Sequence, residues 1–213
     1  MTQRDRALAR QLERYHVRFN DAFWAFFASD VEPQLPSAPV LADLGSGPGL
    51  YLCDVSKRLP NAVLHGVDHG TDMLEHAQSL EYAGATPTMH DEDISEKLPF
   101  EDGSIDLVTC TAVMHTLEDP FQFLDEVRRV LAPNGVFLLY DWVRVPYGDY
   151  IDYRDTEPGD PPEARYPRAL EMFATHNKYT ADDWQWIFEV GRYAIVKKAW
   201  PYVRAIALLT APA

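Results

Sequence analysis

Short apolar runs alternate with helical segments over residues 40–143, and this alternation constrains the possible fold more than any other feature. Helices are expected over 50–59, from a Thr71 cap toward Leu80, and from Pro120 through PFQFLDEVRRVL. The strands predicted around them are VLADL (40–44), AVLHGVD (62–68), TPTMHD (86–91), SIDLVTCTAV (104–113) and GVFLLYDWV (135–143). Strands interleaved with helices form a parallel sheet with right-handed crossovers, so the sequence predicts a doubly wound α/β domain.

The segments on either side of this alternation follow different patterns. Apolar side chains at steps of three and four predict one helix over 6–28, which the proline-rich VEPQLPSAP ends. Residues 144–179 are rich in Pro, Tyr and acid, and the TADD sequence after them resembles a capping box that begins a helix. The β-rich runs 193–200 and 202–210 are separated only by Pro201, which is too short for a parallel crossover. We therefore expect a C-terminal antiparallel hairpin.

Composition narrows the function classes. The 33 acidic and 19 basic residues leave a net charge of -14, which disfavours nucleic acid as a partner. No apolar run approaches the roughly 20 residues of a membrane-spanning helix, and the N-terminus lacks the apolar core of a secretory signal. Cys53 and Cys110 lack metal-binding spacing. These features predict one cytoplasmic domain, monomeric or homodimeric, with no metal, no nucleic-acid partner and no membrane span.

The stretch LADLGSGPG (41–49) places three glycines directly after the first predicted strand. Gly45, Gly47 and Gly49 allow a ligand to approach the backbone at the edge where doubly wound sheets bind ligands. The alternative is a plain tight turn. Asp68 ends the second strand about 20 residues further on, where an acid can accept hydrogen bonds from ribose; it could instead be a solvated loop acid or a helix cap. The G-x-G-x-G spacing differs from the G-x-G-x-x-G of dinucleotide sites.

Five motifs, in order, resemble the class I S-adenosylmethionine-dependent methyltransferases, in particular the small-molecule type. The motifs are DLGSGPG, GVDHG, DISEKLPFEDGSIDLV, VMHTLEDP and FLDEVRRVLAPNGVFLL, and the resemblance covers residues 38–143. That family has a seven-stranded sheet ending in an antiparallel hairpin, in agreement with the interpretation of 193–210. An NAD-dependent reductase would continue with parallel units instead. The resemblance implies S-adenosylmethionine as the cofactor and one domain: a helical cap (1–37), a cofactor-binding core (38–143), a substrate-covering insertion (144–179), and a final helix and hairpin (180–213).

The resemblance also implies roles for individual residues toward the cofactor. The turn formed by Gly45, Ser46, Gly47 and Gly49 would lie under its methionine part, whose amino group Asp43 would position directly or through water. Asp68, with its neighbour His69, would bind the ribose, and Thr111 would contact the methionyl end. Asp93 and Ile94 would bind the adenine; because Asp91 and Glu92 directly precede them, the adenine-binding pair could lie one or two residues earlier.

Three residues are candidates for catalysis, although methyl transfer has no universal catalytic residue in this family. His115 follows the fourth strand and could be a general base or a loop histidine packed on the cofactor. Asp141 could hydrogen-bond a substrate amine or hydroxyl, or cap a turn; alternation points it away from Tyr140 and Trp142. His176 could face the cleft or serve the turn before the last helix.

The acceptor site is expected to come from the N-terminal helix and the insertion. The residues predicted to bind the acceptor are Tyr15, Phe19, His115, Asp141 and Tyr147, with further insertion aromatics at Tyr150, Tyr153, Tyr166 and Phe173. Aromatics at helical spacing are more often core, so the first set could be packing. We expect methyl transfer to an O, N, S or C atom of a small metabolite. A protein or peptide side-chain methyltransferase, or a cofactor-binding protein without methyl transfer, remain alternatives.

Overall fold

A computed structural model of the protein describes residues 3–153, 170, 172–202 and 204–213. Most of the predicted insertion, including Tyr166, lies outside the described residues, as does the side chain of Tyr153. Within the described ranges, no helix combines the length and the apolar character needed to cross a bilayer.

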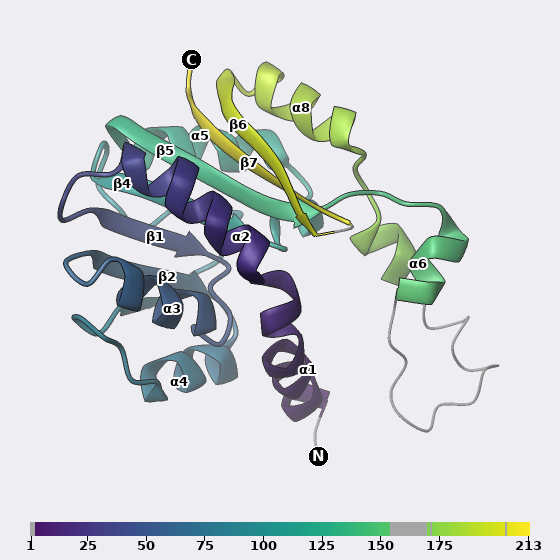
Figure 1. The fold of residues 1–213 in the computed structure, drawn as a ribbon, viewed down its shortest axis with the longest axis horizontal. Coiled ribbons are helices and arrows are strands. Elements are labelled where there is room, and N and C mark those ends of the chain that lie inside the picture. Colours follow the sequence, from purple (N-terminus) through teal and green to yellow (C-terminus); the bar gives the residue numbers. More distant parts are fainter. Residues whose placement is uncertain (1–2, 154–169, 171, 203) are drawn as a thin grey trace.

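The structure is built on one seven-stranded sheet in the order β3-β2-β1-β4-β5-β7-β6 (Figure 1). Strands β1 to β5 pair in parallel, whereas β7 pairs antiparallel with both β5 and β6. The strands are β1 (Val40–Leu44), β2 (Val63–Asp68), β3 (Thr88–Asp91), β4 (Ile105–Thr111), β5 (Leu131–Trp142), β6 (Tyr193–Tyr202) and β7 (Ala205–Pro212). This arrangement confirms the doubly wound sheet and the C-terminal hairpin. Pro201, however, lies within β6, and the chain reverses after it.

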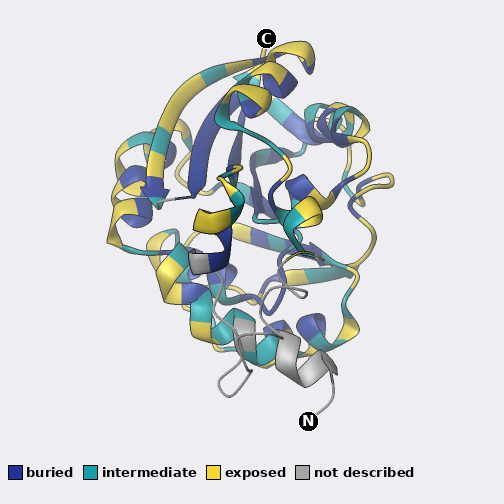
Figure 2. Ribbon diagram, turned by 90° about the vertical axis from the view of Figure 1, so that its right-hand side faces the viewer, coloured by how far each residue is buried: buried dark blue, intermediate teal, exposed yellow. Residues whose placement is uncertain are grey.

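Helices cover both faces of the sheet, and each face has its own apolar core. One core joins the sheet to α5 (Pro120–Val130) and α8 (Ala181–Val190) through Phe123, Trp184 and Phe188. The other joins it to α1 (Gln3–Arg18), α2 (Asp21–Phe26) and α3 (Leu50–Arg58). Helix α4 (Thr71–Ser79) packs beside β2 and β3. The central strands are accordingly buried along most of their length, while the helices alternate between buried and exposed residues (Figure 2).

Two shorter helical segments follow the carboxyl ends of β4 and β5. A 3-10 turn covers Met114–Thr116, and α6 covers Tyr147–Tyr153 beyond the end of β5 (Figure 1). Residues 172–176, within the predicted insertion, are also helical. The capping box before α8 is confirmed, because Thr180 accepts from the backbone N–H of Asp183 while the Asp183 carboxylate accepts from that of Thr180.

Two helix predictions are wrong in detail. The predicted helix 6–28 is divided, because Asn20 interrupts it and caps α2: its Oδ1 accepts from Phe23 N at 3.0 Å and its Nδ2 donates to Pro201 O at 3.0 Å. Helix α2 continues into a π turn (Phe27–Val31) and a 3-10 turn (Glu32–Gln34). Helix α4 does begin at Thr71, but its N-cap is Gly70, whose N–H donates to Asp68 Oδ1 at 2.8 Å.

The double role of Asn20 leads to a stability prediction. Replacing Asn20 by Ala removes the cap of α2 and the bond to the C-terminal hairpin, and should lower the unfolding free energy by about 1–2 kcal/mol. Asn20→Asp keeps a capping oxygen but loses the donor to Pro201 O, so it should cost less. Urea unfolding of the three proteins tests this order, and equal stability of wild type and Asn20→Ala would contradict it.

Candidate functional site

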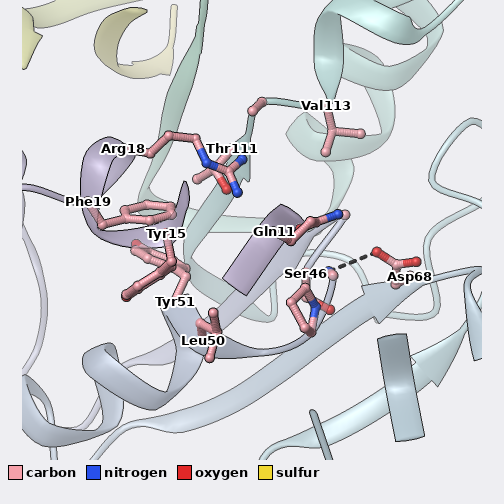
Figure 3. Close-up of a pocket in the computed structure, with 14 residues that line it drawn as sticks. Gln11, Tyr15, Arg18, Phe19, Ser46, Leu50, Tyr51, Asp68, Thr111 and Val113 are labelled. Atoms are coloured by element: carbon pink, nitrogen blue, oxygen red, sulfur yellow. Dashed lines mark hydrogen bonds between the residues drawn. The ribbon is translucent and has the colours of Figure 1, made fainter. Parts of the chain in front are cut away.

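A cavity opens at the carboxyl edge of the sheet, where the loops after β1, β2 and β4 meet. Its volume is about 520 Å³, including the part open to solvent. Because β1 lies between β2 and β4, the strand order reverses here, as at the binding sites of other doubly wound sheets. Side chains of α1 face the loops after β1 and β4 across it (Figure 3). Its lining residues are Gln11, Tyr15, Arg18, Phe19, Gly45, Ser46, Gly47, Pro48, Leu50, Tyr51, Asp68, Thr111, Ala112 and Val113.

The glycine turn has the backbone that its sequence predicts. Gly45, Gly47 and Gly49 have φ values of 76°, 52° and 79°, in the left-handed region that favours glycine. A Cβ on Gly45 would lie 2.6 Å from a methyl of Val113, which is too close. Glycine at this position therefore allows the loop after β1 to pack closely against the loop after β4. A Cβ on Gly47 would lie 3.1 Å from Gln11 Oε1, across the cavity. The turn therefore exposes its backbone to the cavity at Gly47.

Asp68 joins the two loops that flank the cavity. Its Oδ2 accepts from Gly47 N and its Oδ1 accepts from Gly70 N, both at 2.8 Å. Asp68 also lines the cavity (Figure 3), and each carboxylate oxygen can accept a further hydrogen bond. The side chain is therefore placed both to hold the glycine turn and to accept from a ligand hydroxyl.

The Ser46 hydroxyl is buried beside the cavity. The residue is 7% exposed, and its Oγ has no hydrogen-bond partner among the described residues. A Cβ on Gly66 of β2 would lie 2.8 Å from this oxygen, so the hydroxyl faces the sheet. Leaving a buried hydroxyl without a partner costs about 1–3 kcal/mol.

Asp43 lies beneath the glycine turn and does not line the cavity. Its Oδ1 accepts from Thr109 Oγ1 at 2.7 Å. Burial raises the pKa of Asp43 to about 7, and the hydrogen bond from Thr109 opposes that rise; the charge of Asp68 adds to it and that of Arg18 reduces it. Asp43 is consequently a buried acid that changes its charge near neutral pH.

The loop after β4 forms a further side of the cavity, besides the glycine turn and Asp68. Thr111 lines the cavity, as its predicted role requires, and so do Ala112 and Val113. Ala112 has a φ of 56°, which is uncommon for a residue other than glycine, and its N–H donates to Tyr140 O at 2.8 Å. Such strain costs on the order of 1–3 kcal/mol and tends to occur at functional sites.

Besides Asp43, four residues of the predicted cofactor site do not line the cavity: Gly49, His69, Asp93 and Ile94. Gly49 packs against Ala77 and Tyr82. His69 and Asp93 are exposed, whereas Ile94 is buried in the core beside α5. Asp93 Oδ1 accepts from both the N–H and the hydroxyl of Ser95 at 2.8 Å, and these bonds lower the pKa of Asp93. The roles of these residues toward adenine and ribose stay predictions.

The three catalytic candidates form one hydrogen-bonded chain. His115 Nδ1 lies 2.7 Å from Asp141 Oδ1, and His115 Nε2 lies 2.8 Å from His176 Nδ1. Asp141 Oδ2 also accepts from His115 N at 3.0 Å. Asp141 and His115 are 1% and 2% exposed, while His176 is half-buried. Alternation along β5 is confirmed, since Tyr140 packs in the core on the opposite face.

Asp141 also lines a second, narrow hollow next to the cavity, which is too tight to hold a water molecule. The hollow shares Arg18, Phe19, Thr111 and Ala112 with the cavity; its other lining residues are Tyr140, Asp141, Trp142 and Ala205. Its walls are therefore largely aromatic and apolar, with one carboxylate and one guanidinium.

The residues predicted to bind the acceptor divide into two groups. Tyr15 and Phe19 line the cavity but are also core residues, each 5% exposed. Tyr15 Oη donates to Asp54 Oδ2 at 2.6 Å, and burial together with Asp54 raises the pKa of Tyr15. Tyr147 lines neither space and packs edge-on against Phe173, with ring centroids 5.0 Å apart.

Sequence reasoning missed Gln11, Arg18 and Val113 as cavity residues. Gln11 and Arg18 lie on the same face of α1 as Tyr15, at spacings of four and three residues, so the helical period was the signal that could have identified them. Within the described ranges, no group of three or more His, Cys, Asp or Glu side chains is arranged to hold a metal ion.

Comparisons with known proteins find similarity to methyltransferases over the middle part of the chain. Residues 42–139 match the sequence profile of a family described as "Methyltransferase domain". An uncharacterized methyltransferase of Bacillus subtilis is 34% identical over 100 residues, which are 46% of this chain and 39% of that protein. A demethylmenaquinone methyltransferase of Deinococcus radiodurans is 30% identical over 100 residues, 47% of this chain and 42% of that protein. The chain thus spans less than half the length of each of these relatives.

Solved structures show the same fold over nearly the whole chain. A plantazolicin methyltransferase, solved with a pentazolic desmethylPZN analog and SAH, superimposes with a TM-score of 0.74 at 15% identity, covering 99% of this chain and 92% of the other. A SAM-dependent methyltransferase from Aquifex aeolicus gives a TM-score of 0.65 at 17% identity, covering 92% and 91%. At these identities, the likeness establishes the fold.

The raised pKa of Asp43 predicts how stability depends on pH. Between the ordinary Asp pKa of about 4 and the folded value, the folded protein binds more protons than the unfolded chain, so this group's contribution falls as pH rises to about 7. The amide in an Asp43→Asn variant cannot ionise. The unfolding free energy of Asp43→Asn minus that of wild type should therefore increase from pH 4 to pH 7, by up to about 4 kcal/mol, since one pKa unit is about 1.4 kcal/mol. A difference that is constant across this range in denaturant titrations would contradict the assignment.

Proposed function

We propose that the protein uses S-adenosylmethionine and transfers its methyl group to a small organic acceptor, because residues 42–139 match a methyltransferase profile and the fold is that of solved methyltransferases. The atom methylated would be O, N, S or C. The observation that carries the proposal is the left-handed glycine turn at the carboxyl edge of the sheet, held by Asp68, which also lines the cavity.

The residues at the cavity fit this cofactor. Gly47 and Ser46 would lie under its methionine part, Asp68 would accept from ribose hydroxyls, and Thr111 would face the methionyl end. Asp43 would act from beneath the turn as a buried counter-charge, with any contact to the amino group made through water. When bound, the cofactor supplies a methyl carbon activated by the adjacent sulfonium.

The protein itself would contribute to catalysis mainly by positioning the two reactants. Methyl transfer is an in-line displacement, and holding the reactants in attack geometry can contribute several kcal/mol to catalysis. Helix α1 closes one side of the cavity and is anchored by two bonds: Tyr15 to Asp54, and Tyr140 Oη to Arg18 O at 2.9 Å. A helix fixed in this way would exclude water and orient both reactants.

The charge of the protein and the content of one similar solved structure support a small acceptor. The net charge of -14 disfavours a polyanionic acceptor. The similar plantazolicin methyltransferase was solved with an organic analog in place, which supports an acceptor of this kind for the fold.

Cofactor binding tests the proposal without knowledge of the acceptor. Calorimetric titration with S-adenosylhomocysteine should show binding at one site. Asp68→Ala should weaken it about 10- to 100-fold, because a charge-assisted hydrogen bond contributes about 1.5–3 kcal/mol. Glu75→Gln, an exposed acid on α4, is the matched control and should bind as wild type does.

Absence of binding by folded wild-type protein would contradict the proposed cofactor. Equal affinity in Asp68→Ala and Glu75→Gln would instead refute the ribose assignment alone. Circular dichroism of both variants distinguishes loss of a ligand from loss of the fold.

A further inference from the structure

We propose that Asp43 is a specificity-determining residue: a positive charge that enters the cavity drives its carboxyl group to release a proton, so the site prefers the sulfonium cofactor over the product that lacks this charge. The inference rests on the proposed methyl transfer and concerns the same site. It gives the buried acid beneath the glycine turn a role that needs no direct contact with the cofactor.

Asp43 lies on the central strand of the sheet, next to the cavity but shielded from bulk water. It pairs in register with Gly66 of β2 on one side and with Thr109 of β4 on the other. Gly45, two residues further along the chain, lines the cavity. Because Asp43 is only 1% exposed, the charge on its carboxylate has little solvent around it to stabilise it.

The side chains that surround Asp43 within the sheet and α3 are neutral. Its Oδ1 accepts from the hydroxyl of Thr109 at 2.7 Å. The Tyr51 phenol, from α3, stays neutral because burial and the charge of Asp43 raise its pKa. The Cys110 thiol of β4 also stays neutral, because burial and the carboxylates of Asp141 and Asp43 raise its pKa. No group of this set supplies a compensating positive charge.

The charges that do act on Asp43 belong to the cavity itself. Asp68, at the end of β2, raises the pKa of Asp43, whereas Arg18, on α1, lowers it. Both side chains line the cavity, and they come from different sides of it (Figure 3). Coulomb interactions are weakly screened inside a protein. A ligand charge held between Asp68 and Arg18 therefore acts on Asp43 as these two residues do.

In the protein without ligand, Asp43 holds its proton over part of the neutral range. Burial is the main reason that its pKa rises to about 7. A cation in the cavity favours the ionised carboxylate and so lowers this pKa, and the proton passes to water. Binding of a cation below pH 7 then includes the loss of a proton, so its affinity falls as the pH falls.

This linkage distinguishes the two forms of the cofactor. S-adenosylmethionine carries one positive charge more than S-adenosylhomocysteine, namely that of the sulfonium. The ionised carboxylate of Asp43 attracts the first form more strongly than the second. Once the methyl group has been transferred, the sulfonium charge is gone and Asp43 takes a proton from water again below about pH 7. The product is consequently held less tightly than the cofactor that entered.

Calorimetric titration of the intact chain in two buffers of different ionisation enthalpy counts the protons released. At pH 6.5, below the ordinary pKa of an α-amino group, the ligand's own amino group stays protonated. Binding of S-adenosylmethionine by wild type should release about half a proton or more per site. S-adenosylhomocysteine should release fewer, and Asp43→Asn should release none from this group. Glu75→Gln, an exposed acid on α4, is the matched control and should release as many as wild type.

The pH dependence of affinity gives the second measurement. Relative to Asp43→Asn, wild type should bind S-adenosylmethionine about 5- to 10-fold more tightly at pH 8 than at pH 6. Groups other than Asp43 titrate in both proteins, so their effects cancel in this comparison. The preference of wild type for S-adenosylmethionine over S-adenosylhomocysteine should also increase over this range, and that of Asp43→Asn should stay constant.

NMR of wild type keeps the test independent of any variant. The carboxyl carbon of Asp43, assigned through its backbone, should titrate with a midpoint near 7 in the free protein and at about 6 or below with S-adenosylmethionine. An unchanged midpoint, or equal proton release with both ligands, would overturn the inference while leaving the proposed cofactor in place. Absence of binding of both ligands would contradict the proposed function itself, and this inference with it.

Discussion

The parallel pairing of β1 with β2 on one side and β4 on the other is the constraint on which the site depends. Carboxyl ends of parallel strands meet at one edge, so the glycine turn, Asp68 and Thr111 converge there from three different strands. Asp68 then bonds the turns after β1 and β2 to each other through two backbone N–H groups. The N–H groups of Gly45 and Ser46 donate to Val67 O as well, so the turn is held to the end of β2 by both backbone and side-chain bonds.

Two segments outside the parallel core complete the site from opposite directions. Helix α1 closes the cavity through Tyr15 and is tied to α3 by the bond to Asp54. The insertion reaches the same edge through Asn177 and Val145, and it contributes His176. This division is consistent with a shared architecture for the cofactor and separate segments for the acceptor, because the family resemblance covers the core and not these two segments.

Local patterns in the sequence were sufficient for the sheet but not for contacts between distant segments. Periodicity predicted the strands, the antiparallel hairpin and the capping box at Thr180, because each depends on neighbouring residues. The break at Asn20 depends on Pro201, far along the chain, and no local pattern shows it. His115, Asp141 and His176 were each recognisable as candidates, yet their joint geometry is tertiary. Tyr147 was predicted at the acceptor site from its place in the tyrosine-rich insertion; it packs on Phe173, and its role toward an acceptor stays a prediction.

The central claim is that this chain transfers methyl groups, and turnover of labelled cofactor tests it most directly. The protein is incubated with S-adenosylmethionine carrying a trideuterated methyl group and with a mixture of small metabolites that offer O, N, S and C acceptor atoms, and the products are examined by mass spectrometry. The account predicts a product that gains the mass of one labelled methyl group, in step with formation of S-adenosylhomocysteine. Folded protein that binds the cofactor but yields neither labelled product nor S-adenosylhomocysteine would contradict it.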